Sequence, residues 1–191
     1  MSQYYFLVAS LPLLAFEDRD ATEPAAFLES LGDHLPPAEL ETVAAARIDA
    51  PSVEAGAGAA YPVIENWNRF ERGLRNALVR LRASRSDPGE FIRRDANGDA
   101  ADDPVEIAEA AREAHAHESP LSGEGILNRA RWAHLDELEV GHFFDLDRII
   151  VYYLKLQILA RRRLFTRRDG EQRFAAINEQ IMNDYYQEQS E

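Results

Sequence analysis

The sequence predicts an all-α protein, a bundle of about seven or eight helices, and three observations support this fold class. Apolar residues recur at helical spacing through a long segment in the N-terminal half, residues 61–85. A second segment, residues 146–159, is apolar on nearly all sides, which is typical of a helix buried by several neighbours. No alternating pattern of the kind that marks a strand follows residue 12.

The N-terminal part contains short helices before the long one. Residues 4–11 are apolar, but the segment is too short for periodicity to distinguish a buried helix from a strand. The prolines in segments 22–24 and 36–37 predict two helix starts, because proline suits the first turn, and these helices should end near Gly32 and Ile48. The long helix then carries a packing seam with a/d spacing, formed by Val63, Trp67, Phe70, Leu74, Ala77 and Leu81.

Residues 94–103, which read RDANGDAADD, are polar, acidic and nearly free of apolar side chains. This composition predicts a mobile linker at 95–103 that separates an N-terminal lobe, 1–94, from a C-terminal lobe, 104–191. The alternative is one domain with a mobile loop at 95–103. The letters DANGD also resemble the start of a calcium loop, but the glycine is misplaced for that motif, so an acidic solvated loop is the preferred interpretation.

Four further helices are expected after this segment. An alanine-rich helix should occupy residues 104–117, and a leucine-containing helix should occupy 121–141 and end at Gly141. Asp145 is positioned to cap the buried helix, which should continue to about Arg168. A last helix should follow, with an apolar stripe of Phe174, Ile177, Ile181 and Tyr185.

Composition excludes several classes of function. The chain has 191 residues, 46% of them hydrophobic, no cysteine and a net charge of -13. This acidity disfavours nucleic acids and anionic membranes, and it suits a basic protein partner. No signal peptide and no apolar run of about 20 residues are visible, so no direct membrane insertion is expected. A cytoplasmic location, peripheral on the inner membrane only through a partner complex, is the simplest expectation.

Glu139 and His142 form an E-x-x-H pair, the spacing that di-iron helical bundles use. Such bundles need two pairs, and only one is found, so neither a metal nor a cofactor is expected. The alternative is a helical metal-dependent enzyme that uses this pair with Glu137 or His134. The simpler interpretation of His142 is a histidine at a helix C-terminus, which the helix dipole favours.

Arginines 161, 162, 163, 167 and 168 resemble a nucleic-acid patch, but they lie at a predicted helix end, where cations are favoured. A protein contact or a solvated helix end is therefore preferred. The tyrosine pairs 4–5, 152–153 and 185–186 are expected in the core. No nucleotide-binding loop or serine-nucleophile elbow occurs, so catalysis by this chain is not expected.

Two segments resemble a known family. Residues 4–16, YYFLVASLPLLAF, and residues 135–162, LDELEVGHFFDLDRIIVYYLKLQILARR, are similar to the ends of an uncharacterised bacterial family whose genes often accompany V-type ATPase operons. That family in turn resembles the C-type subunit of V/A-type ATPases, whose eukaryotic counterpart is the d-type subunit. The C-type subunit is all-helical and forms a socket between the membrane rotor ring and the central stalk.

The resemblance implies a non-catalytic accessory or central-stalk-type subunit of a V/A-type rotary ATPase, a complex that transports protons or sodium ions. On this interpretation the chain acts through protein–protein contacts with other ATPase subunits, made by arginine and aromatic anchors. A free-standing interaction module is the other non-catalytic alternative. The candidate partner-binding residues are Arg69, Arg72, Arg80, Arg162 and Arg167.

Overall fold

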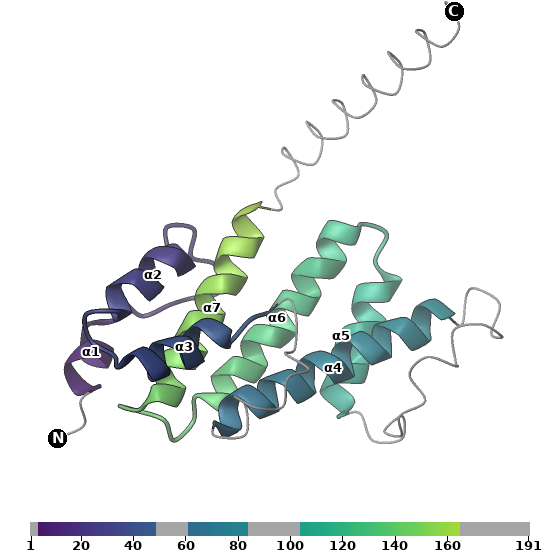
Figure 1. Cartoon of the computed structure of the whole chain (residues 1–191). Helices are drawn as coiled ribbons and strands as arrows, with labels where there is room; N and C mark the ends of the chain where they lie inside the picture. Colours follow the sequence, from purple (N-terminus) through teal and green to yellow (C-terminus); the bar gives the residue numbers. More distant parts are fainter. Residues whose placement is uncertain (1–3, 49–60, 84–103, 165–191) are drawn as a thin grey trace, which may run out of the picture.

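The computed structural model describes residues 4–48, 61–83 and 104–164, and in these residues the protein is all-α, as the sequence predicts (Figure 1). The described ranges contain seven helices and no strand. The helices are α1 (Tyr5–Ser10), α2 (Pro24–Leu31), α3 (Pro37–Ala45), α4 (Pro62–Ala83), α5 (Val105–Ala116), α6 (Pro120–Leu138) and α7 (Leu146–Leu164).

Prolines and one aspartate set the helix starts. Proline occupies the first turn of α2, α3 and α6, where its missing N–H costs no hydrogen bond. Asp145 caps α7, because its Oδ1 accepts a hydrogen bond of 2.9 Å from the backbone N–H of Arg148. The predicted cap of the buried helix is therefore confirmed.

Two predicted helix ends are wrong. The third helix ends at Ala45, not near Ile48, because the following backbone is extended and the Gln157 side chain of α7 holds it. Gln157 Nε2 donates to the Ala46 carbonyl at 2.8 Å, and the Ile48 N–H donates to Gln157 Oε1 at 3.3 Å. The sixth helix ends at Leu138, so Gly141 lies in the turn beyond it, with a φ of 89° that favours glycine.

Helix α7 is the central element of the fold. It packs against α2, α3, α4 and α6, and in Figure 1 it lies between the short N-terminal helices and α6. Leu154, Leu156, Ile158 and Leu159 are all 0% exposed. Tyr152 and Tyr153 are buried beside Phe27 of α2, with the Phe27 and Tyr152 ring centroids 5.1 Å apart. The prediction of a helix buried on several sides is confirmed.

Helices α4, α5 and α6 pack on one another. The predicted seam of α4 is buried from Val63 to Ala77. α5 and α6 approach closely at Gly123, where a Cβ atom would lie 2.8 Å from the carbonyl oxygen of Ala114. Helices α4 and α5, on the two sides of residues 84–103, therefore contact each other. The predicted linker at 95–103, with its lobe boundary and calcium-like letters, lies outside the described residues. The predicted last helix lies outside them too.

Residues 5–10 form a helix, which resolves the helix-or-strand alternative. Only Leu7 of this helix is buried, and Phe6 is 80% exposed, so α1 is a surface helix and not a core one. None of the described helices combines the length and the apolar content that crossing a bilayer would require.

Candidate interaction site

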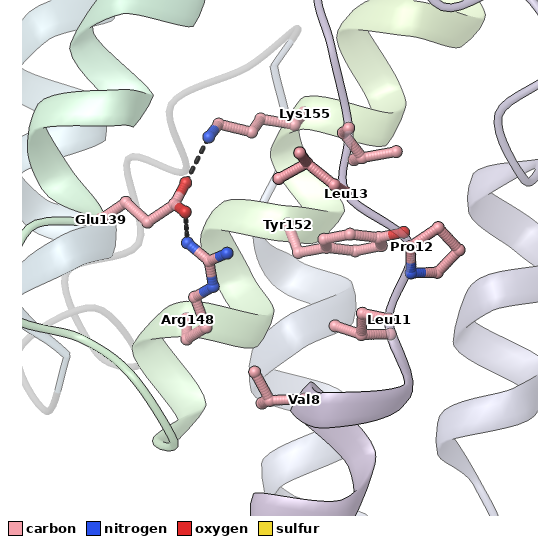
Figure 2. Close-up of a pocket in the computed structure, with 9 residues that line it drawn as sticks. Val8, Leu11, Pro12, Leu13, Glu139, Arg148, Tyr152 and Lys155 are labelled. Carbon is pink, nitrogen blue, oxygen red and sulfur yellow. Dashed lines mark hydrogen bonds and ion pairs between the residues drawn. The ribbon is translucent and has the colours of Figure 1, made fainter.

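The fold brings the two ends of the described chain together. A pocket of about 110 Å³ separates residues 8–14 from the C-terminal end of α6 and the first half of α7 (Figure 2). The N-terminal wall is apolar. The opposite wall is formed by Glu139, Arg148, Tyr152 and Lys155.

Charged groups on this wall neutralise one another. Figure 2 shows the Glu139 carboxylate between Lys155 and Arg148, and it forms ion pairs with both. Lys155 also lies 2.6 Å from Asp136 Oδ1. Burial lowers the pKa of the Lys155 ammonium, and the neighbouring Asp136 opposes this shift. Because both cations contact carboxylates of the chain itself, the wall joins α6 to α7 and is poorly suited to a free anion.

Glu139 and His142 do not share one helical face, so this part of the sequence interpretation is wrong. Helix α6 ends before both of them, and Glu139 points to the pocket cations. His142 Nδ1 instead lies 2.7 Å from Asp145 Oδ2 in the turn before α7. His134 and Glu137, the other suggested ligands, form a separate pair at 3.5 Å. No group of three or more His, Cys, Asp or Glu side chains suited to a metal ion occurs within the described ranges.

A second ionic cluster lies deep between α4 and α6. The side chains of Glu71 and Arg131 are 1% and 8% exposed, and Arg131 Nε donates to Glu71 Oε1 at 2.6 Å. Arg131 Nη1 also donates to Asn128 at 2.9 Å and to Glu124 at 3.0 Å. Burial acts to lower the pKa of Arg131, but Glu71 and Glu124 outweigh burial and raise it. The cluster is structural, and no sequence pattern pointed to it.

The predicted arginine contacts divide into two groups. Arg69, Arg72 and Arg80 lie on the exposed face of α4, and Arg69 binds Glu65 at 3.0 Å. Arg162 has an intramolecular role, because its guanidinium lies 3.8 Å from the centroid of the Phe16 ring and 3.1 Å from Glu17. Arg167 lies outside the described residues.

The rest of the described arginine cluster also binds the chain itself. Arg163 Nη1 donates to the Ala21 carbonyl at 2.7 Å, and its Nη2 lies 2.9 Å from Glu23. Arg161 lies 3.2 Å from Glu124. These side chains are half-buried. Through Arg163, the last turn of α7 is bonded to the N-terminal segment.

Four exposed aromatic side chains lie on α1 and in the turn before α7, and we call them the aromatic patch: Tyr5, Phe6, Phe143 and Phe144. The Tyr5 and Phe144 ring centroids lie 4.7 Å apart, so α1 contacts the turn before α7. Phe6 is 80% and Phe143 is 72% exposed. Tyr5 is 47% exposed, so its predicted place in the core is wrong. The only sequence indication was HFFD, two adjacent aromatics between two helices.

Known proteins offer no further guide to this site. No family model matches this chain, nor does any curated protein or solved structure. The resemblance of segments 4–16 and 135–162 therefore remains an interpretation of those residues. What the structure adds is their arrangement in space, since these two segments supply both walls of the pocket and all four rings of the aromatic patch.

Proposed function

We propose that this protein is a non-catalytic accessory or central-stalk-type subunit of a V/A-type rotary ATPase, and that it acts through protein–protein contacts. One observation carries the proposal. The two segments with the family resemblance, far apart in sequence, pack together through the pocket and through the Tyr5–Phe144 contact. The two segments that carry the resemblance therefore contribute to one region of the fold.

The packing suits a mechanical role. α4 and α7 contain 22 and 19 residues. At a rise of 1.5 Å per residue they are roughly 33 Å and 28 Å long. α7 is held by four neighbouring helices and by ion pairs at both ends, so it resists bending. A rigid helical unit of this kind can hold two partners at a fixed separation.

The ionic chemistry of the described residues also favours a non-catalytic role. Glu71, Arg131, Glu139 and Lys155 are engaged in ion pairs that join helices. Truncation of one partner in such a pair leaves a buried charge uncompensated, which is a large effect on stability. Each of these four charged side chains therefore has a structural role in the fold.

Affinity purification from native membranes tests the proposal. The full chain, tagged at its own locus, should recover V/A-type ATPase subunits in fixed stoichiometry under mild detergent, as measured by mass spectrometry. A strain that expresses the tag on an unrelated acidic helical protein is the control. Recovery of no ATPase subunit would exclude the proposed role. The flanking genes offer a quicker check, since they should encode ATPase subunits.

The aromatic patch favours a second candidate, a free-standing interaction module. An exposed cluster of rings binds a partner whether or not that partner belongs to a rotary ATPase. The same purification distinguishes the two functions, because a free-standing module should recover a stoichiometric partner that is not an ATPase subunit.

A further inference from the structure

We infer that the aromatic patch is the docking site for an amphipathic helix of another protein, with an apolar stripe bordered by basic side chains. The inference rests on the proposed role in protein–protein contacts, but not on the identity of the complex. Exposed apolar patches with polar rims mark interaction sites, and aromatic residues are enriched there. All of the exposed large aromatic side chains in the described residues belong to this patch.

The patch is held in place before any partner arrives. Gly141 turns the chain with a φ of 89°, and the Asp145 cap fixes the start of α7 directly after Phe144. His142 stabilises the same turn, because its Nδ1 lies 2.7 Å from Asp145 Oδ2. On the α1 side, Tyr5 contacts both Phe6 and Phe144, with ring centroids 5.5 Å and 4.7 Å away. A preformed surface loses little conformational entropy on binding, which favours affinity.

The charges in the two segments that carry the patch determine the sign of the charge expected on the partner. Residues 4–16 carry no charge, and residues 136–148 contain five carboxylates against one arginine. That arginine, Arg148, is paired with Glu139, and the nearby Lys155 is paired with Asp136 and Glu139. The side chains of Glu137 and Asp136 are 74% and 55% exposed. This excess of carboxylates in the segment that carries Phe143 and Phe144 attracts a partner segment that has basic residues beside its apolar stripe.

The negative charge of the chain also disfavours other occupants. A second copy of the chain brings another net charge of -13, and residues 165–191 contain six acidic residues against three arginines. An anionic membrane surface is repelled by the same negative charge. An extended peptide that binds by strand addition needs a sheet edge, and the part of the chain that the structure describes has no strand. A helix laid across the rings is the remaining common mode.

Three synthetic peptides of equal length test the inference on the full chain at physiological salt. The first is an amphipathic leucine–lysine helix, the second has glutamate in place of lysine, and the third is a scramble of the first without a stripe. Isothermal titration calorimetry should show the first binding at least about tenfold more tightly than the others, a difference of about 1.4 kcal/mol. Equal binding of the scramble would show that net charge alone attracts the peptide, and it would overturn the inference.

A pair of double variants localises the binding. Phe6→Ser with Phe143→Ser should weaken the first peptide by about tenfold or more, because exposed aromatic anchors dominate such interfaces. Val105→Ser with Leu164→Ser is the matched control, since these side chains are 65% and 73% exposed and lie outside the patch. Circular dichroism confirms that both variants fold. Unchanged affinity in the patch variant would overturn the inference.

Further outcomes separate this inference from its alternatives. Patch-dependent self-association in sedimentation would assign the surface to a second copy, and patch-dependent binding to zwitterionic vesicles would assign it to a membrane; either result overturns the inference. Recovery of ATPase subunits by a chain whose patch does not bind the first peptide would overturn the docking site alone. Peptide binding at the patch without any ATPase recovery would retain the docking site and exclude the proposed function.

Discussion

The middle of α7 and the aromatic patch have similar apolar chemistry and opposite environments. Leu154 and Leu156 are 0% exposed, whereas Phe6 and Phe143 are 80% and 72% exposed. Apolar area removed from water stabilises the fold by roughly 25 cal/mol per Å², and apolar area left in water does not. The comparison indicates that α7 contributes stability and that the patch is open to a partner. Substitutions in α7 should therefore change the free energy of unfolding, and substitutions in the patch should change the affinity for a partner.

Charged residues show the same division. Glu71 is buried and paired with Arg131, while the carboxylates of Glu137 and Asp136, in the segment before Phe143, are 74% and 55% exposed. In the interior, each charge depends on its partner because water cannot replace it. At the patch, the excess of carboxylates creates a field that acts on other molecules.

The largest effect is expected from Glu71→Ala, which leaves Arg131 buried without its main carboxylate. The free energy of unfolding should fall by about 3–5 kcal/mol, measured by urea denaturation. Glu65→Ala on the same helix is the control, because its pair with Arg69 is exposed and should contribute about 0.5 kcal/mol or less. Similar losses in the two variants would show that the Glu71–Arg131 pair is not an interior interaction.

Leu156→Ala should have the next largest effect. Leu156 is 0% exposed in the middle of α7, so its truncation leaves a cavity in the core. The expected loss is about 2–5 kcal/mol in the free energy of unfolding. Leu164→Ala, at the 73% exposed end of the same helix, should change it by no more than about 0.5 kcal/mol. A thermal melt of the Leu156 variant that matches the wild type would refute burial of α7.

A smaller, pH-dependent effect is expected at His134, whose ring stacks on Phe70 with centroids 4.1 Å apart. Burial lowers its pKa below the ordinary 6.5, while Glu137, the Asn66 backbone and Glu71 oppose the shift. The unfolded chain therefore takes up the proton first as the pH falls. Stability should fall as the pH drops through 6.5 towards the lower folded value.

His134→Phe provides the measurement for this effect, because phenylalanine keeps the ring stack and removes the titration. The difference in unfolding free energy between the variant and the wild type should shift in favour of the variant as the pH is lowered from about 7.5 to about 5.5. A difference that is constant across this range would contradict the lowered pKa.

Local patterns in the sequence predicted much of the fold. Proline starts, the a/d seam and the Asp145 cap depend on neighbouring residues, and all are confirmed. The ends of α3 and α6 were wrong because tertiary contacts set them, as the Gln157 hydrogen bonds to residues 46–48 show. The Glu71–Arg131 pair spans 60 residues, a separation at which one sequence gives no pairing information.

The candidate site was less predictable than the fold. Glu139 and His142 have metal-site spacing, but the end of α6 and the core direct them to different partners. The arginine at 162 looked free to bind a partner and instead packs on Phe16. The position of Tyr5 beside Phe144 depends on how α1 meets the turn before α7, which is a property of the tertiary structure and not of either segment alone.

The smallest effect on stability is expected at the two most exposed rings of the aromatic patch. Phe6→Ser and Phe143→Ser, singly or together, should change the free energy of unfolding by no more than about 0.5 kcal/mol each, because the two rings already face water. The same substitution type at a buried ring, Phe27→Ser, is the matched control; Phe27 is 4% exposed and should lose at least about 3 kcal/mol. Urea denaturation of these variants beside the wild type gives the comparison. If the patch variants lose as much stability as the Phe27 variant, the rings belong to the core in solution and no partner is needed to explain them. If they retain wild-type stability, the two rings do not stabilise the isolated fold, and binding remains the physical explanation for large aromatic side chains in water.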